Sequence, residues 1–579
     1  MTSSNHFTRG GQLSMHRLRM WQQVARITLA VILFTAMTIS IGKTLYEVPP
    51  YHFYLFKEYY HGKFLLGFAT KQADIHKATQ QIIHPDGRKT QEYSINIVQS
   101  PWVNYAVANI EYKVWHNSIL GLWIGGVIGL LAVIFFAYRG REQSQQRTER
   151  GTALVSVQQL KKMIRRRKQA SDLQLDGLPL IKDKETSHQI LTGTTGAGKS
   201  NALHKLLPQI RKRGNRAIIV DLTGEFVSRY YDETTDFILN PFDARHQAWS
   251  PWQECTTEAQ YDALASAIIP SGQTSDPFWE NSARIILATA LRKFEKMQAP
   301  SPEALYQLLT KAPIAEYQQF FAGTEATPLT SQEAEKTTAS IRSTLLANLV
   351  GLKYLRDKQA SFSIRQWVSQ DDQNSWLFLS ARPDQRQTLK SLMTAWMDTS
   401  INALMTLPPD SNRRVWLILD ELPALHRLPS LEMALAESRK YGGCVVAGFQ
   451  SIPQLTTVYG TSSAQTLLDL FNTQIFFRNT DPNTTEWISK VLGEQETQEI
   501  KENLSYGANT VRDGVSLSQQ ERKKSVVLPT EVANLQDLQC YVKLPGGYPI
   551  TQLQMSYQQA KQKVKGFVEK QQDEKTRPW

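Results

Sequence analysis

The apolar residues of this 579-residue chain are densest in two runs near its N-terminus. The first run covers residues 27–42 and is bounded by an arginine and a lysine, whose long side chains can reach the interface and so extend the span. The second run, residues 119–138, contains no charged side chain. A bilayer-spanning helix needs about 20 apolar residues. The pattern therefore predicts transmembrane helices at residues 26–46 and 119–138, within a membrane anchor over residues 1–140.

The charges that flank the two runs predict the orientation of this anchor. Residues 1–26 contain four arginines and no acidic residue, and Arg139 and Arg141 follow the second run. Because positively charged flanks stay in the cytoplasm, we expect both termini there and residues 47–117 across the membrane. A cleaved signal peptide is the competing interpretation, but no Ala-x-Ala-like cleavage site follows the first run.

The segment expected across the membrane is rich in aromatic residues just after the first helix. Seven tyrosines and phenylalanines lie between residues 46 and 60. Such residues are typical of the membrane–water interface, so an interfacial belt is one interpretation. A contact surface for another envelope protein is the other.

Positive charge is concentrated beside the second run. The formal net charge is +12, and ten Lys and Arg against two Glu lie between residues 139 and 170. We expect a basic juxtamembrane connector over residues 141–175 that binds anionic lipid headgroups, with DNA contact as the alternative.

Over the whole chain 41% of the residues are hydrophobic and 20% are charged, which is the composition of an ordinary folded protein. The three cysteines are widely spaced and indicate neither a zinc site nor a disulfide framework. The chemistry of the chain must therefore come from other motifs.

Short apolar runs of strand length alternate with helical patterns in the remaining chain, which predicts an α/β fold built on a parallel sheet. The expected strands are residues 188–192, 217–221, 376–379, 415–419, 445–447 and 474–477. We expect a nucleotide-binding domain in two halves, residues 176–250 and 360–556. A C-terminal tail over residues 557–579, either a solvated helix or a loose segment, follows it.

Between the two halves, apolar residues recur at helical spacing over residues 251–359, which predicts an inserted all-helical domain. Asp276 and Ser301, each followed by a proline, are expected N-caps. Thr330 and Glu333 have the spacing of a capping box ahead of a further helix.

Residues 193–200 read GTTGAGKS and satisfy the P-loop pattern GxxxxGK[ST], between a predicted strand and a predicted helix at residues 201–213. The backbone N–H groups of such a loop and the positive end of the helix bind phosphate. Lys199 is expected to reach the β- and γ-phosphates and Ser200 to hold Mg²⁺, so ATP and Mg²⁺ are the expected cofactors. A plain glycine-rich turn is the alternative. The expected ATP-binding residues are Gly193, Thr194, Thr195, Gly196, Ala197, Gly198, Lys199 and Ser200.

Residues 413–421 read RRVWLILDE, a hydrophobic strand that ends in two carboxylates and matches a Walker B strand. Asp420 is expected to hold the hydrated Mg²⁺ together with Ser200, and Glu421 to polarise the attacking water. Gln450 ends the later strand in VVAGFQS and is expected to contact the γ-phosphate or orient water. A purely structural role is the alternative for this glutamine.

Further segments follow one another in a specific order, namely IIVDLTGEF, NPFDAR, DPFW, WLILDELPALHRLP, ESRKYGG and SYGANTVRDGVS. Together with GTTGAGKS and VVAGFQS, this order resembles type IV coupling proteins, most closely the TraD-like conjugative coupling ATPases. The resemblance implies a RecA-like P-loop NTPase motor with an all-α insertion domain. It also implies a two-helix transmembrane anchor in the bacterial inner membrane, with the crossing segment in the periplasm.

The same resemblance implies a function. It predicts a hexameric, DNA-translocating ATPase that recruits relaxase-bound DNA and pumps single-stranded DNA to a type IV secretion channel. The expected partners are further copies of the chain, single-stranded DNA with its relaxase, inner-membrane components of the channel and anionic lipids. The alternatives are a nucleotide-gated docking receptor for protein cargo without processive pumping, and a chromosome-segregation translocase.

By the same resemblance, Arg439 of ESRKYGG acts on ATP bound by the neighbouring subunit. A head-to-tail ring sets one subunit's P-loop against a different surface of the next, so an arginine can enter there. A surface salt bridge of Arg439, or Lys440 in the same role, is the alternative.

Overall fold

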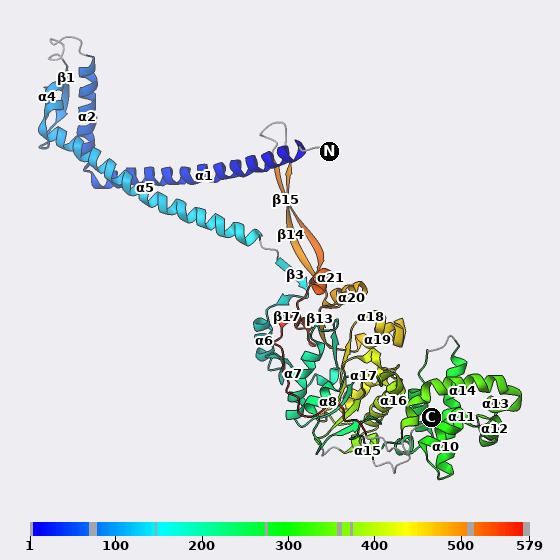
Figure 1. The fold of residues 1–579 in the computed structure, drawn as a ribbon. Helices are drawn as coiled ribbons and strands as arrows, with labels where there is room; N and C mark the ends of the chain where they lie inside the picture. Colours follow the sequence, from blue (N-terminus) through cyan, green and yellow to red (C-terminus); the bar gives the residue numbers. More distant parts are fainter. Residues whose placement is uncertain are drawn as a thin grey trace. The chain divides into compact units, whose positions relative to one another are not determined.

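A computed structural model of the protein describes residues 4–68, 78–144, 147–272, 276–355, 362–370, 374–505 and 514–570. The chain forms two compact units, Met1–Arg147 and Thr148–Trp579 (Figure 1).

Two long helices dominate the N-terminal unit, α1 (Ser4–Glu47) and α5 (Pro101–Ser144). Each contains a stretch long and apolar enough to cross a membrane, Trp21–Glu47 and Pro101–Arg139. Both helices are longer than the apolar runs that predicted them, because helix continues into the polar residues on either side.

Glycines let α1 and α5 approach closely. A Cβ atom at Gly121 would lie 2.7 Å from the carbonyl oxygen of Ala36, and one at Gly125 would lie 2.8 Å from that of Ile32. Small residues at every fourth position are the usual basis of helix contact in a bilayer. Polar pairs add to the contact, since the Ser40 and Ser118 hydroxyl oxygens are 2.8 Å apart.

A small domain joins the two long helices. It consists of α2 (Pro50–Gly67), β1 (Thr79–Ile83), β2 (Lys89–Tyr93) and α4 (Ser94–Gln99), with β1 and β2 paired antiparallel. The hydroxyl of Tyr51 donates to the carbonyl of Ile83 (2.7 Å), and the N–H of Ile83 donates to the hydroxyl of Tyr54 (3.0 Å). These two tyrosines pack beside the core of the small domain, and their hydroxyls are engaged within it.

A ten-stranded mixed sheet forms the centre of the C-terminal unit. In spatial order its strands are β4 (Leu154–Val155), β17 (Ile550–Gln554), β16 (Gln539–Lys543), β13 (Thr473–Phe477), β7 (Gln189–Thr192), β12 (Gly443–Phe449), β11 (Val415–Leu419), β8 (Arg216–Asp221), β10 (Trp376–Ser380) and β9 (Phe237–Leu239). The strands from β13 to β9 run parallel, while β16 is antiparallel to both of its neighbours. The six predicted strands are confirmed. The antiparallel end of the sheet was not predicted.

Helices cover both faces of this sheet (Figure 1). Ala217 and Ile219 of β8 pack in one buried cluster with α7 (Lys199–Lys212), whereas Ile218 and Val220 pack in a second cluster with α16 (Arg386–Met405). Alternate side chains of a strand point to opposite faces, so continuous apolar strands need cover on both sides. The α/β fold class is therefore confirmed.

Only helices and helical turns occur among the described residues from 251 to 355. The α-helices are α9 (Glu258–Ile268), α10 (Pro277–Lys296), α11 (Pro302–Lys311), α12 (Ile314–Phe321), α13 (Thr327–Thr330) and α14 (Glu335–Leu349). Their buried side chains continue the cluster that packs under α16.

Two of the three predicted N-caps in this region are confirmed. The carboxylate of Asp276 accepts from the N–H of Phe278 (2.9 Å), and the hydroxyl of Ser301 accepts from the N–H of Ala304 (3.0 Å). The predicted capping box at Thr330 is wrong, because Thr330 ends α13 and its hydroxyl donates to the carbonyl of Ala326 (3.1 Å).

The described part of residues 141–175 is largely folded rather than a simple connector. It contains β3 (Arg147–Gly151), β4, α6 (Val157–Arg166) and β5 (Ala170–Leu175). Ser156 caps α6, and Leu160 and Ile164 are fully buried beneath it. The density of basic residues hid this amphipathic helix from the sequence interpretation.

Further elements complete the C-terminal unit. A long antiparallel ribbon of β14 (Glu494–Ser505) and β15 (Gly514–Ser525) pairs with β3 through β14. It holds the ends of the SYGANTVRDGVS motif, whose residues 506–513 lie outside the described residues. The remaining elements are β6 (Leu178–Ile181), α8 (Glu225–Tyr230), α15 (Ile364–Ser369), α17 (Leu431–Glu437), α18 (Ile452–Tyr459), α19 (Thr461–Asp469), α20 (Pro482–Leu492) and α21 (Pro529–Ala533).

Residues 557–570 form neither a solvated helix nor a loose tail. They run as an extended segment along α7 and α8, with hydrogen bonds from the N–H groups of Lys563 and Val564 to the carbonyl of Ser228 (2.8 and 3.1 Å). Gly566 packs so closely on Gly224 that a Cβ atom at Gly566 would lie 2.5 Å from the Gly224 carbonyl oxygen. Polar composition predicted solvation here, but backbone hydrogen bonds hold the segment. Residues 571–579 of the predicted tail lie outside the described residues.

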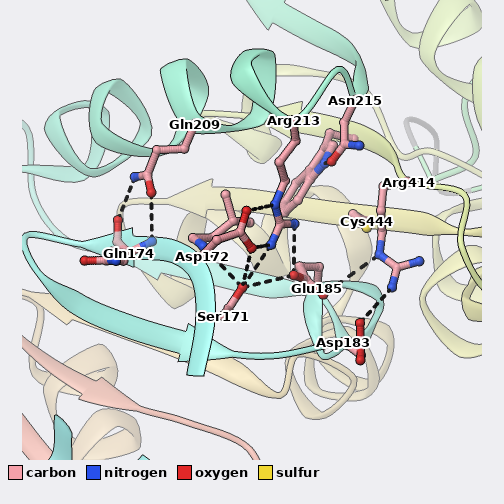
Figure 2. Close-up of polar contacts among 12 residues, drawn as sticks. Ser171, Asp172, Gln174, Asp183, Glu185, Gln209, Arg213, Asn215, Arg414 and Cys444 are labelled. Atoms are coloured by element: carbon pink, nitrogen blue, oxygen red, sulfur yellow. Dashed lines mark hydrogen bonds and ion pairs between the residues drawn. The ribbon is translucent and has the colours of Figure 1, made fainter. Parts of the chain in front are cut away.

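A polar cluster ties together the amino-terminal edge of the sheet (Figure 2). Arg213, just after α7, donates to Asp172 of β5 (2.7 Å) and to the buried Glu185 (3.0 Å). The other carboxylate oxygen of Glu185 faces the guanidinium of Arg414 at 3.9 Å. The guanidinium of Arg213 lowers the pKa of Asp172 to about 2. This cluster lies before β7 and β11, at the edge opposite the one where these strands end.

Candidate nucleotide-binding site

The loop between β7 and α7 has the backbone that a phosphate cradle needs. Gly196 and Gly198 have φ angles of +78° and +126°, a region that favours glycine. Gly193 is restricted by space instead, because a Cβ atom there would lie 2.7 Å from Cβ of Phe477. The helix begins at Lys199, so its positive end faces the loop.

Lys199 is 8% exposed, and its ammonium donates to the carbonyl of Gly193 within the loop. Burial lowers the pKa of Lys199, while Glu421 and Asp420 oppose that shift. The ammonium is thus held beside the loop that would carry the phosphates, which is the geometry the P-loop pattern predicts.

Ser200 and Asp420 meet although they are far apart in the sequence. The hydroxyl of Ser200 donates to Oδ2 of Asp420 (2.9 Å). Oδ1 of Asp420 is buried and accepts no hydrogen bond within the part of the chain that the structure describes. Burial raises the pKa of Asp420, with the Ser200 hydrogen bond opposing. A buried carboxylate oxygen without a donor beside a hydroxyl is a donor set that suits Mg²⁺.

Glu421 and Gln450 form a second pair next to the first. Nε2 of Gln450 donates to Oε2 of Glu421 (2.9 Å), and the hydroxyl of Thr195 donates to Oε1 of Gln450 (3.3 Å). Gln450 follows β12, which lies between β7 and β11, so it bridges the P-loop and the carboxylate. Burial raises the pKa of Glu421, and the Gln450 hydrogen bond opposes that shift.

A cavity of about 590 Å³ brings these residues together at the carboxyl ends of the parallel strands. The sequence-predicted residues that line it are Thr194, Thr195, Gly196, Gly198, Lys199, Ser200, Asp420, Glu421 and Gln450. Of the other P-loop residues, Ala197 is fully buried beneath the loop.

Sequence reasoning missed several residues of the same cavity. They are Asn201, His204, Thr223, Glu225, Arg229, Arg386, Asp537, Leu538 and Tyr557. His204 could have been found, because it lies one helical turn after Ser200 and therefore on the same face. Its ring bonds Glu225 (2.9 Å) and Arg229 (2.7 Å). Asn201 directly follows Ser200, and Thr223 and Glu225 follow the end of β8, so sequence order could have indicated these three as well. The remaining residues reach the cavity through the tertiary fold.

Arg439 does not line this cavity. It lies in a helical turn, Ser438–Tyr441, just before the amino end of β12, whereas Gln450 follows the carboxyl end. A seven-residue strand spans roughly 23 Å, so Arg439 cannot reach the nucleotide site of its own chain. Arg439 is exposed, and the neighbouring Lys440 pairs with Glu437 at 3.9 Å.

The chain matches known proteins along most of its length. The family model described as "Type IV secretion-system coupling protein DNA-binding domain" matches residues 172–556. "Coupling protein TraD" of Escherichia coli (strain K12) is 33% identical over 567 residues, which cover 96% of this chain and 78% of that protein. "Protein VirD4" of Rhizobium radiobacter is 24% identical over 401 residues, which cover 64% of this chain and 57% of that protein.

Solved structures are similar to about three quarters of the chain. The unbound monoclinic form of "Bacterial conjugative coupling protein TrwBdeltaN70" has a TM-score of 0.67 and 34% identity, covering 73% of this chain and 96% of its own. "Plasmid coupling protein TrwB in complex with ADP and Mg2+" has a TM-score of 0.66 and 33% identity, covering 74% and 98%. Over that share of its length the chain therefore has the α/β fold of a relative whose structure was solved with ADP and Mg²⁺.

Proposed function

This chain belongs to the type IV secretion-system coupling proteins, and from that premise we propose that it is a hexameric inner-membrane ATPase that recruits relaxase-bound DNA and pumps single-stranded DNA to a conjugative secretion channel. The observation that carries the proposal is the convergence of Lys199, Asp420, Glu421 and Gln450 on one cavity. The TrwB structure with ADP and Mg²⁺ supports nucleotide binding by the same fold.

In the proposed reaction the P-loop binds the phosphates of ATP and Lys199 places its charge on the β- and γ-phosphates. Ser200 and Asp420 would hold Mg²⁺, which neutralises phosphate charge when bound. Glu421 accepts a hydrogen bond from the attacking water and orients it. Gln450 holds Oε2 of Glu421 at 2.9 Å and so keeps the carboxylate in one orientation. ATP and water give ADP and phosphate: as the water adds to the γ-phosphorus, the bond to the β–γ bridging oxygen breaks and Glu421 takes the proton that the water gives up.

The active ring is proposed to need Arg439 from the neighbouring subunit. Its distance from its own cavity along β12 supports a role between subunits, and an arginine supplied in this way speeds phosphoryl transfer by about 10³-fold or more. Mixing Arg439→Ala and Lys199→Ala chains, each inactive alone, should restore part of the ATPase rate. Mixed rings that contain both variants and show no recovery would remove Arg439 from the site.

The anchor over residues 1–140 is proposed to place both termini in the cytoplasm and residues 47–117 in the periplasm, where channel components are the expected partners. Its helices α1 and α5 are the two candidate spans. Because α5 ends at Ser144 and α6 starts at Val157, the exposed basic residues of α6 are separated from the second candidate span by a short length of chain. They are Lys162, Arg165 and Arg166. We propose that they bind anionic headgroups.

The second candidate function is a nucleotide-gated docking receptor for protein cargo, without processive pumping. The two differ in whether DNA accelerates ATP hydrolysis. The test is the ATPase rate of the full-length protein in lipid nanodiscs with and without single-stranded DNA, with Glu421→Gln as the background control. Stimulation by DNA supports the pump. A rate that DNA leaves unchanged in assembled rings supports the receptor.

A further inference from the structure

An aromatic ring from the C-terminal segment lies at the nucleotide cavity. Tyr557 lines the cavity together with Gly198 and Ser200, although 357 positions separate it from Ser200. Its side chain is 69% exposed, so it does not serve as a core residue. A ring that is open to a polar cavity has its face available for a planar ligand.

Asn201 fixes the backbone on both sides of this tyrosine. Nδ2 of Asn201 donates to the carbonyl of Ser556 (3.2 Å), and Oδ1 accepts from the N–H of Gln558 (2.7 Å). Asn201 is 6% exposed and directly follows Ser200 of the P-loop. The position of the Tyr557 ring is therefore tied to the residues that would hold the phosphates.

A second contact ties Ser556 to the same region. The hydroxyl of Ser556 donates to Asp176 (3.0 Å), and Lys205 of α7 donates to the Ser556 oxygen (2.9 Å). The ring thus stands on a segment that is held at several points, which suits a preformed subsite.

Leu538 supplies an apolar wall beside Gly198. Its φ angle is +64°, in the left-handed region that side chains rarely adopt. Its N–H donates to the carbonyl of Ala197 (2.9 Å) and its carbonyl accepts from Met555 (2.9 Å), so both neighbours hold it there. Strained residues of this kind cluster where a protein clamps a ligand.

The sheet order gives the direction in which a bound nucleotide extends. Asp420 and Glu421 follow β11, two strands to one side of β7, whereas Leu538 precedes β16, two strands to the other side. Since the reacting γ-phosphate must face Glu421, the base end of the nucleotide points toward Leu538 and Tyr557.

We propose that Leu538 and Tyr557 form the base subsite of the nucleotide cavity, with the purine stacked on the Tyr557 ring, and that Asn201 is the positioning residue for that ring. This rests on the proposed function, because it requires a nucleoside triphosphate on the P-loop. Stacking recognises the face of a base rather than its edge, so adenine and guanine bind alike.

The test measures binding of ATP, GTP and inorganic tripolyphosphate, each with Mg²⁺, to the full-length protein in detergent by calorimetry. Tyr557→Ala should weaken both nucleotides about tenfold and leave tripolyphosphate unchanged, since one base stack is lost. Tyr557→Phe should keep wild-type affinity. Gln559→Ala, an exposed position in the same segment, is the matched control and should also behave as wild type.

The role of Asn201 is tested by a double-mutant cycle. Asn201→Ala should weaken ATP binding, and Asn201→Ala combined with Tyr557→Ala should bind ATP no worse than Tyr557→Ala alone. Unchanged ATP affinity in Tyr557→Ala, or an equal loss for tripolyphosphate, would overturn the base subsite. A wild-type protein that binds none of the three ligands would instead overturn the proposed function itself.

Discussion

Replacement of Glu421 by glutamine separates hydrolysis from nucleotide binding. The change removes one negative charge but keeps the size of the side chain, and the new amide can still accept from Gln450 through its oxygen, as Oε2 does now at 2.9 Å. Asp420 and Ser200 are left in place, so Mg²⁺ and phosphate binding should persist. A positioned general base contributes about 10²–10⁴-fold, and we expect the ATPase rate to fall by that factor.

The assay compares the steady-state ATPase rate with the affinity for a non-hydrolysable ATP analogue in the same preparation. Glu432→Gln, on an exposed residue of α17, is the control and should leave both quantities unchanged. Burial raises the pKa of Glu421, so the wild-type rate should fall as pH drops through a value above the usual 4.5, as the carboxylate becomes protonated. The reasoning is refuted if Glu421→Gln retains more than about one tenth of the wild-type rate.

Three further changes test other parts of the structure. Lys199→Ala should abolish ATP binding but not membrane insertion, since the phosphate contact is lost. The control Lys212→Ala, on the exposed face of α7, should bind ATP normally. Equal ATP binding by both variants in calorimetry would contradict the P-loop assignment. Asp172→Asn should lower the free energy of unfolding by less than about 1 kcal/mol at neutral pH, because the Asp172 side chain is 69% exposed and solvent screens its pair with Arg213. Arg213 depresses the pKa of Asp172 to about 2. The pair therefore stabilises the fold fully above about pH 4, and the difference between Asp172→Asn and wild type in thermal scans should disappear as the pH falls through about 2. Gly125→Leu should slow disulfide crosslinking between Ser40→Cys and Ser118→Cys in vesicles, because a side chain at position 125 meets the backbone of α1. Gly126→Leu is the control and should leave the crosslinking rate unchanged, because a side chain at position 126 enters open space.

The strands that could be predicted are those in which most consecutive residues are apolar and buried. Every residue of β8 and β11 is buried, and a short apolar run between polar turns is an unambiguous signal for such a strand. Strand β17 reads ITQLQ and β16 reads QCYVK, so each mixes polar and apolar residues over only five positions. Pairing with β13, rather than local pattern, makes β16 a strand, and that pairing is not visible in the sequence.

The residues of the site likewise divide into those that local sequence pattern predicts and those that only the tertiary fold brings to the cavity. That Lys199, Ser200, Asp420 and Glu421 lie at one cavity could be predicted, because each stands at a fixed offset from a glycine loop or a strand end, where the backbone directs the side chain. The placement of Arg439 outside its own cavity also follows from local order, since it precedes the strand that Gln450 ends. In each case the motif specifies where a residue lies relative to its own strand or helix.

The C-terminal segment shows why the rest of the site could not be predicted. In residues 557–570 the apolar residues Tyr557, Ala560, Val564 and Phe567 recur at intervals of three and four, a spacing that favours a helix rather than the extended segment that the structure shows. The segment is held by backbone hydrogen bonds to Ser228 and by the side-chain amide of Asn201, contacts that any sequence with free N–H and C=O groups could make. Contacts that are specific to residue type, such as the close approach of Gly566 to Gly224 and the Arg382 guanidinium over the Phe567 ring, form only once the segment is in place. Because backbone groups make many of the hydrogen bonds that hold the segment, the local sequence pattern does not show where the segment binds, and so it did not predict that Tyr557 lines the cavity.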